Sequence, residues 1–315
     1  MKRRGFLGID VGSISAKFVF LDDNRNILFE SYVRVAGNPI DTVKMCMKEL
    51  DGVMNDEKME VGALCTTGSG RQLAGALLGA DIVKNEISAH ARGAIELHPD
   101  VRTIIEIGGQ DSKIIIVENG AVVDFAMNLV CAAGTGSFLD SQARRLDISI
   151  EELSRRSILS RHPTAIAGRC TVFSESDMIS KQQMGHAQED ILMGLCHALA
   201  RNFIGNLARG KQLCSPVLLQ GGVSANLGIL RAFENALGCS VIVPSHHLVM
   251  GAYGAALLAM ETGIDKSRFR GSGIWAHHIR TQSVNCEDCP DHCEIIEILD
   301  AGEVVGRTGG RCGKW

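Results

Sequence analysis

The chain has 315 residues, is 45% apolar and 22% charged, and carries a formal net charge of −4. This length allows one or two domains with buried cores. Only 4% of the residues are aromatic and the net charge is small, which argues against a nucleic-acid surface. The apolar run after MKRR is too short for a signal peptide, and no stretch approaches the ~20 apolar residues of a membrane span. We expect a cytoplasmic protein that binds neither nucleic acid nor membrane.

The first predicted element is a β-hairpin at residues 9–28, and a second hairpin at residues 105–123 repeats its pattern. The two stretches read IDVGSISAKFVFLDDNRNIL and IEIGGQDSKIIIVENGAVV. In both, an acid precedes a lysine by seven residues, and the apolar strand after the lysine reverses at a polar turn. The matched pairs are Asp10 with Glu106, Gly12 with Gly108, Ser13 with Gly109, and Lys17 with Lys113. This agreement indicates an internal duplication.

The polar turns of these hairpins are typical of an anion site. Glycine lets the backbone approach a ligand, and successive N–H groups in a tight turn form a concave site for phosphate. Acids would repel a bare phosphate, but they fit a site in which Mg²⁺ lies between acid and phosphate. Hairpins with polar tips and no ligand are the alternative. The predicted phosphate end comprises Asp10, Gly12, Ser13, Lys17, Gly108, Gly109, Gln110 and Asp111.

Eleven cysteines in a chain without a secretory segment favour metal binding or redox chemistry. Cys131, in LVCAAGTGSFLD, and Cys170, in GRCTVFSESD, each precede a predicted helix, whose N-terminus stabilises a thiolate. We expect Ser174 to cap the second helix, with Asp177 as its capping-box partner. Two cysteines are half the ligands of a 4Fe–4S cluster, and a two-fold dimer would supply the other half.

Buried thiols are the alternative for these two positions, and the residues alone favour it. The same interpretation applies to five cysteines that stand alone in apolar or helical contexts. They are Cys46, Cys65, Cys196, Cys214 and Cys239.

Two glycine-containing segments follow. Residues 216–237, PVLLQGGVSANLGILRAFENAL, predict a strand, a Gly-Gly turn and a helix. A base or ribose would press against the backbone at Gly221 and Gly222, with Asn226 on the same side, although this pattern alone is more often without a ligand. In residues 243–260, Gly251 and Gly254 enter an Ala-rich helix and predict close helix packing.

The C-terminal segment contains Cys286, Cys289 and Cys293 in close spacing, and Cys312 further on. EIIEIL and EVVGR predict a hairpin closed by DAGE, which would return Cys312 to the other three. Four thiols in this arrangement suit a tetrahedral zinc site or an iron–sulfur centre. A disordered tail with free thiols is the alternative.

Taken together, the segments resemble the ATPase superfamily of actin, sugar kinases and heat-shock chaperones. More closely, they resemble the activators of 2-hydroxyacyl-CoA dehydratases and the related ATPase subunits of benzoyl-CoA reductases. The resemblance lies in GIDVGSISAK, TTGSGR, NEISAHARGA, EIGGQDSK, VCAAGTGSFLD, GRCTVFSESD, QGGVSAN and GAYGAALLA, from residue 8 to about 259. The sequence departs from the pattern at Glu106, where the superfamily often has aspartate, and in the tail beyond residue 275, which minimal activators lack.

The resemblance implies an α/β protein with two RNase-H-like, actin-type ATPase domains around a nucleotide cleft and a short cysteine-rich C-terminal hairpin. Domain I would span residues 1–98 and be completed by about 251–275, and domain II, at 99–250, would carry the cluster cysteines. The metal-binding tail would span 276–315. The site would take ATP or ADP with Mg²⁺ organised by Asp10, while Gln110 or Asp111 would position the attacking water.

The implied activity is that of an ATP-driven reductase of anaerobic metabolism. A homodimer would share one 4Fe–4S cluster between the Cys131 and Cys170 residues of both subunits. Ferredoxin or flavodoxin would donate the electron, and a partner iron–sulfur enzyme would accept it. That partner would be a 2-hydroxyacyl-CoA dehydratase, a benzoyl-CoA reductase-like enzyme or a double-cubane cluster protein. The alternatives are a small-metabolite kinase with the same ATPase core and an ATPase-gated, metal-containing sensor.

Overall fold

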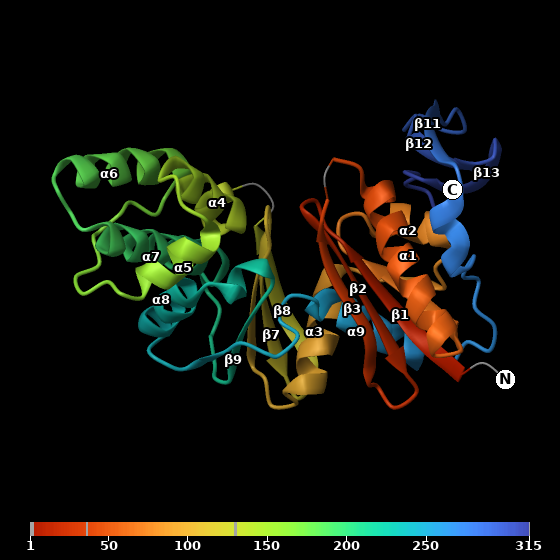
Figure 1. Cartoon of the computed structure of the whole chain (residues 1–315), viewed down its shortest axis with the longest axis horizontal. Helices are drawn as coiled ribbons and strands as arrows, with labels where there is room; N and C mark the ends of the chain where they lie inside the picture. Colours follow the sequence, from red (N-terminus) through yellow and green to blue (C-terminus); the bar gives the residue numbers. More distant parts are fainter. Residues whose placement is uncertain (1–2, 36, 129–130, 315) are drawn as a thin grey trace. The chain divides into compact units, whose positions relative to one another are not determined.

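A computed structural model describes residues 3–35, 37–128 and 131–314 of the chain. The chain forms two compact units (Figure 1). Unit 1 comprises the residues up to Gly93 together with those from Val249 onward, and unit 2 comprises Ala94–Leu248. Within the described residues, no helix is both long enough and apolar enough to cross a membrane.

Unit 1 contains a five-stranded sheet in the order β3-β2-β1-β4-β5. Its strands are β1 (Arg3–Val11), β2 (Ser15–Asp22), β3 (Ile27–Arg34), β4 (Met59–Thr67) and β5 (Ile82–Val83), and its helices are α1 (Pro39–Asp56), α2 (Arg71–Leu78) and α9 (Met250–Glu261). The helix α3 (Glu86–Leu97) begins in unit 1, and its last turn belongs to unit 2. The core strands are apolar runs buried over nearly their whole length. An added Cβ at Gly8 would overlap the carbonyl of Ala252, so this glycine allows α9 to pack directly on β1. Gly254 meets Ala89 of α3 in the same way, which confirms the predicted close helix packing.

Unit 2 contains a second five-stranded sheet in the order β10-β9-β6-β7-β8. Its strands are β6 (Thr103–Ile107), β7 (Ser112–Glu118), β8 (Ala121–Asn128), β9 (Val217–Gln220) and β10 (Val241–Ile242). Its helices are η1 (Ala132–Gly134), α4 (Gly136–Arg145), α5 (Ile150–Ser157), α6 (Thr171–Gln183), α7 (Gln188–Leu207), η2 (Gly222–Ala225) and α8 (Leu227–Leu237). The core includes Phe203 and Phe233, whose rings meet edge to face at 5.4 Å between centroids.

The two sheets repeat one topology. In each, three antiparallel strands are followed by two strands parallel to the central one: β1 pairs with β2 and β4, and β6 pairs with β7 and β9. The hairpins that the sequence predicted are β1–β2 and β6–β7. Their registers agree, because Asp10 faces Lys17 and Glu106 faces Lys113.

A small third sheet follows in unit 1. It has the order β11-β12-β13, with β11 (Ile279–Asn285), β12 (Glu294–Asp300) and β13 (Glu303–Thr308), and η3 (Ser272–Ala276) precedes it. The sequence pattern did not predict β11. The sheet is anchored to the unit 1 core, since Ile298 is fully buried there and the Gly306 backbone packs on Ala76 of α2 (Figure 1).

Candidate functional site

The first polar hairpin holds an acid and a lysine face to face. Asp10, near the end of β1, is 4% exposed, and its Oδ2 lies 3.2 Å from Nζ of Lys17 on β2. The Gly12 N–H donates to the Ser15 carbonyl at 2.9 Å and closes the turn. Ser13 is exposed at the tip. The hairpin therefore presents a backbone turn and a serine next to a buried ion pair.

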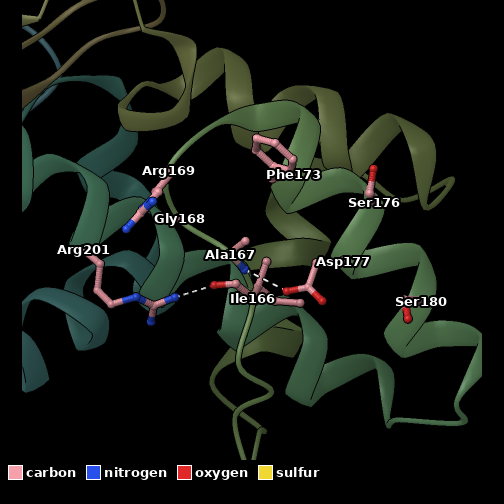
Figure 2. A pocket seen from close by; sticks show the side chains of 9 residues that line it. All are labelled: Ile166, Ala167, Gly168, Arg169, Phe173, Ser176, Asp177, Ser180 and Arg201. Carbon is pink, nitrogen blue, oxygen red and sulfur yellow. Dashed lines mark hydrogen bonds between the residues drawn. The ribbon is translucent and has the colours of Figure 1, made fainter.

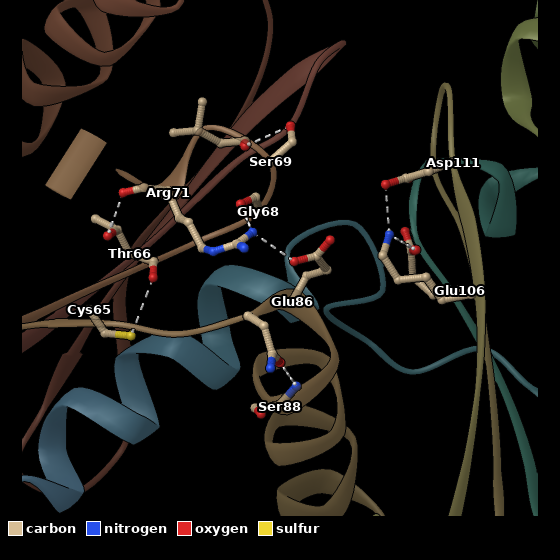
Figure 3. A network of polar contacts seen from close by, with 12 residues as sticks. Cys65, Thr66, Gly68, Ser69, Arg71, Glu86, Ser88, Glu106 and Asp111 are labelled. Atoms are coloured by element: carbon tan, nitrogen blue, oxygen red, sulfur yellow. Dashed lines mark hydrogen bonds and ion pairs between the residues drawn. The ribbon is translucent and has the colours of Figure 1, made fainter. Parts of the chain in front are cut away.

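The second hairpin has the same construction in unit 2. Lys113 Nζ lies 2.8 Å from Glu106 and 3.0 Å from Asp111 (Figure 3). The Gly108 N–H donates to the Asp111 carbonyl at 3.0 Å. Burial alone would lower the pKa of Lys113, but the two carboxylates outweigh it and raise that pKa. Gln110 is exposed at the tip and Asp111 is partly exposed, so both predicted water-positioning residues face solvent at least in part.

In each unit, a glycine with positive φ packs closely against the acidic side chain of the hairpin. Gly68 follows β4 with φ +86°, and an added Cβ there would overlap Asp10 Oδ1. Gly221 follows β9 with φ +89°, and an added Cβ would lie 2.7 Å from Glu106 Oε1. The sequence pattern predicted a role for Gly221 but not for Gly68. The signal that could have found it was the TTG that follows one apolar strand, just as QGG follows the other.

Arg71 fixes the loop that carries Gly68. Its Nη1 donates to the Gly68 carbonyl at 2.9 Å and lies 3.2 Å from Glu86 of α3, while its own carbonyl accepts from Thr66 Oγ1 (Figure 3). This network gives a structural reason for the TTGSGR motif, because it holds the loop against Asp10.

Further groups surround the two acids. An added Cβ at Gly251 of α9 would lie 2.6 Å from Asp10 Oδ2 and 3.1 Å from His90 Nε2. Gly251, expected only to pack, and His90, which was not predicted, therefore both belong to this site. Thr67 Oγ1, in register with Asp10, and Ser112 Oγ, on the second hairpin, are buried and lack a hydrogen-bond partner among the described residues. Such hydroxyls fit a bound, hydrated ligand better than an empty hairpin tip.

The residues predicted for the nucleoside lie after β9. Gly221 donates its N–H to the His247 carbonyl at 2.8 Å, and Gly222 opens η2. Asn226 Oδ1 accepts from the Ile229 N–H at 3.1 Å and caps α8. The amide nitrogen of Asn226 is buried without a hydrogen-bond partner in the described part of the chain. The side-chain oxygen of Asn226 therefore caps α8, while its side-chain N–H groups are available to bind a ligand.

Cys131 is partly buried and stands immediately before η1. Its backbone is fixed by Asn128, whose side chain accepts from the Cys131 N–H at 2.9 Å and donates to its carbonyl at 2.7 Å. Five residues later, α4 begins, and its first turn contacts the second hairpin. The Gly136 N–H donates to the Gly108 carbonyl at 2.9 Å, and the Ser137 N–H donates to the Gly109 carbonyl at 2.8 Å.

Cys170 is also partly buried and is the N-cap of α6. The predicted capping by Ser174 is wrong, since the helix already begins at Thr171. Ser174 Oγ instead donates back to the Cys170 carbonyl at 2.9 Å, and Asp177 accepts from the Ala167 N–H at 2.9 Å. A serine inside a helix often bonds to the carbonyl one turn earlier, which removes it as a cap.

Asn202 of α7 lies between the two cysteine segments. Its Nδ2 donates to the Gly168 carbonyl at 2.6 Å, two residues before Cys170. Its Oδ1 lies on the other segment, since an added Cβ at Gly134 of η1 would be 3.0 Å from it. One buried side chain therefore contacts both segments.

A cavity of about 790 Å³ is lined in part by Gly168 and Arg169, which directly precede Cys170 in the sequence (Figure 2). Next to the cysteine, Val172 and Phe173 are 65% and 66% exposed. Phe173 also lines the cavity, so an exposed apolar side chain lies at its edge. The cavity is lined by Ile166, Ala167, Gly168, Arg169, Phe173, Ser176, Asp177, Ser180 and Arg201.

Burial raises the pKa of the Cys46 thiol to about 11 and those of Cys65 and Cys196 to about 12. The predicted burial is confirmed for these three but is wrong for Cys214 and Cys239, which are partly exposed. Cys286 is buried, Cys289 and Cys293 are partly exposed, and Cys312 is exposed. In the residues described, no three histidine, cysteine, aspartate or glutamate side chains are gathered closely enough to hold a metal ion.

Residues 7–259 match the BadF/BadG/BcrA/BcrD ATPase family. The chain belongs to this family. The chain is 38% identical over 255 residues to the (R)-2-hydroxyglutaryl-CoA dehydratase activating ATPase of Acidaminococcus fermentans, covering 81% of this chain and 96% of the relative. It is also 37% identical over 261 residues to the activator of lactoyl-CoA dehydratase of Anaerotignum propionicum, covering 82% of this chain and 99% of that protein.

Among solved structures, the chain is similar to the activator of the 2-hydroxyisocaproyl-CoA dehydratase from Clostridium difficile with bound ADPNP. The TM-score is 0.75 at 33% identity, covering 82% of this chain and 95% of the other. The resemblance that the motifs indicated is therefore confirmed, and so is a mixed α/β, two-lobed ATPase fold.

Proposed function

We propose that this protein hydrolyses ATP to drive low-potential electron transfer to a partner iron–sulfur enzyme. The observation that carries the proposal is the pair of hydrogen bonds from Gly136 and Ser137 to Gly108 and Gly109. These bonds attach the helix that follows Cys131 to the turn of a predicted phosphate hairpin. Any shift of that turn on nucleotide exchange would move the cysteine segment.

The phosphate end of the nucleotide is assigned to the tips of the two hairpins. Backbone N–H groups at Gly12, Ser13, Gly108 and Gly109 would bind the phosphates, and the lysines would keep the neighbouring acids ionised. Asp10 and the spare hydroxyl of Thr67 offer oxygen ligands for Mg²⁺, which supplies charge neutralisation at the phosphates when it is bound. A similar activator has bound ADPNP, which supports a nucleotide site in this chain.

Gln110 and Asp111 are proposed to position the attacking water. Gln110 is exposed at the tip of the second hairpin. Asp111 is partly exposed, its carboxylate lies 3.0 Å from Lys113 Nζ, and carboxylate oxygens can accept a hydrogen bond from water. The nucleoside is assigned to Gly221, Gly222 and the spare amide nitrogen of Asn226.

Cys131 and Cys170 of each of two subunits are proposed to hold one shared 4Fe–4S cluster, which supplies one-electron transfer when it is bound. Both cysteines are partly exposed. Cys170 is the N-cap of α6, where the helix N-terminus favours negative charge, and Cys131 directly precedes the short η1. The exposed Val172 and Phe173 beside Cys170 can be covered by the second subunit or by the partner enzyme. These features fit the cluster.

The relatives suggest which enzyme accepts the electron. Because similar chains are activators of 2-hydroxyacyl-CoA dehydratases, such a dehydratase is the first acceptor to assay. A benzoyl-CoA reductase-like enzyme and a double-cubane cluster protein are the other candidates. Ferredoxin or flavodoxin would supply the electron.

The test is anaerobic purification followed by iron, sulfide and electron paramagnetic resonance analysis. We expect a brown dimer in which about four irons, together with the paramagnetic signal of their cluster, are lost in Cys131→Ser and Cys170→Ser but retained in Cys239→Ser. ATP should accelerate iron chelation relative to ADP. A colourless protein that hydrolyses ATP would contradict electron transfer and favour the kinase or sensor alternative.

A further inference from the structure

The family match ends at residue 259, so the segment with β11, β12 and β13 lies outside it. The alignment with the Acidaminococcus fermentans relative likewise takes up 96% of that protein but only 81% of this chain. The segment nevertheless contains four cysteines, which the proposed function does not use. Their placement in the third sheet therefore calls for its own explanation.

Three of these cysteines lie in one short loop between β11 and β12. Cys286 directly follows β11 and Cys293 directly precedes β12. The Cys286 N–H donates to the Cys293 carbonyl at 2.9 Å and closes the base of the loop. Within the loop, the His292 N–H donates to the Cys289 carbonyl at 3.3 Å. The antiparallel pairing thus keeps all three at the same end of the sheet.

The last residues of the chain bring Cys312 to that same loop. Gly309, just after β13, packs so closely on the Glu294 carbonyl that an added Cβ would overlap it. Lys314 forms an ion pair with Asp288, and the Cys286 thiol lies 3.6 Å from the same carboxylate. Cys312 is therefore held between two anchor points, three residues after Gly309 and two before Lys314.

We propose that Cys286, Cys289, Cys293 and Cys312 of one subunit form a tetrathiolate metal centre that closes the open end of this sheet. Four cysteines from one chain form a closed tetrahedral set, which suits zinc or an iron–sulfur centre. Because the four sulfurs are not gathered in the described part of the chain, metal binding includes rotation of the partly exposed Cys289 and Cys293 and the exposed Cys312 toward Cys286. A small sheet with few buried side chains gains stability from such a crosslink.

The centre would also brace part of the ATPase core. The sheet packs on the C-terminal end of α2, where Arg270 donates to the carbonyls of Ala76 and Leu77 at 2.8 and 2.9 Å and also bonds to Val305 of β13. The first residue of that helix, Arg71, binds the Gly68 carbonyl. Metal loss is thus expected to loosen the helix that fixes the Gly68 loop.

The experiment begins with the Cys131→Ser/Cys170→Ser double variant, so that the shared cluster contributes no metal. The full chain is prepared anaerobically from zinc-supplemented and iron-supplemented cultures. Zinc, iron and sulfide are counted per subunit, and the native thiols are titrated with a disulfide reagent. We expect about one zinc, or iron with matching sulfide, together with four fewer reactive thiols than after treatment with a strong chelator.

The matched substitutions are Cys289→Ser and Cys312→Ser, with Cys239→Ser as control. Cys312 is exposed, so its loss leaves the folded core intact. Each tail substitution should lower metal content about tenfold and abolish the fall in melting temperature that the chelator causes, whereas Cys239→Ser should change neither. A double variant without stoichiometric zinc or iron would overturn the proposal. Metal content unchanged by both tail substitutions would overturn it equally.

Discussion

Lys113 Nζ lies 2.8 Å from the carboxylate of Glu106, with both side chains almost fully buried. Lys17 and Asp10 hold the corresponding positions in unit 1, but at 3.2 Å and with the lysine side chain 16% exposed. Removing one partner of a buried ion pair leaves an uncompensated charge. The two pairs therefore allow the same substitution to be compared in two environments.

We predict that Lys113→Met destabilises the protein by about 3–5 kcal/mol, and that Lys17→Met costs clearly less. Thermal unfolding measured by circular dichroism would check this order. Since the folded pKa of Lys113 is raised, its contribution is complete below its unfolded pKa and is lost only as pH rises through the folded value. The deficit of Lys113→Met should therefore stay constant from pH 6 to 9, and a deficit that shrinks across this range would contradict the assignment.

The buried thiols predict a loss of stability in alkali. The folded pKa of Cys196 is raised to about 12, so between ~8.5 and that value the folded state keeps a proton that the unfolded state releases. Stability should fall by up to ~1.4 kcal/mol per pH unit for this thiol. Denaturant titrations at pH 8 and 10 measure how far the free energy of unfolding falls between these pH values. This fall should be smaller for Cys196→Ala than for the parent protein, and it should be the same for Cys239→Ala as for the parent.

Substitutions of Gly68 and Gly221 test whether their close packing against Asp10 and Glu106 is needed for activity. Gly68→Ala and Gly221→Ala should each lower Mg²⁺-dependent ATP hydrolysis about 10²-fold, because the new methyl group would displace Asp10 or Glu106. Gly120→Ala is the matched control, since Gly120 also has positive φ, at +73°, but an added Cβ would meet nothing within 4 Å among the described residues. It should cost only the backbone strain of about 1–2 kcal/mol. If all three variants lose activity equally, the loss would result from impaired folding and not from displacement of the acids.

Asp10→Ala tests the metal assignment directly. It should abolish most of the Mg²⁺-dependent hydrolysis, and Asp111→Ala should slow turnover, while the melting temperature shift with ADP shows that nucleotide still binds. Full activity in both variants would mean that the phosphate site lies elsewhere.

The sequence predicted the hairpins well because the acid, glycine and lysine have local spacing that a strand pair converts directly into register. Gly68 and His90 were missed because their relation to Asp10 depends on β4 pairing with β1 and on α9 packing against both β1 and α3, which no local spacing reports. The prediction of Ser174 as the N-cap of α6 was wrong for a related reason. Ser174 has the right chemistry for a cap, but the helix extends one turn further toward Cys170.

Asn202→Ala tests the link between the two cysteine segments. The substitution removes the hydrogen bond to the Gly168 carbonyl and the contact with Gly134, at a cost of about 1–3 kcal/mol. Iron should then be chelated faster, and the difference between ATP and ADP in that rate should shrink, although nucleotide affinity stays the same. Asn206→Ala is the control, because Asn206 lies on the exposed side of α7 and donates to Asn202 Oδ1 at 3.1 Å rather than to either cysteine segment. The contrary result is that iron is removed from Asn202→Ala at the parent rate, with the same difference between ATP and ADP. The nucleotide would then not act on the cluster through this side chain, and the hydrogen bonds from Gly136 and Ser137 would be the remaining link.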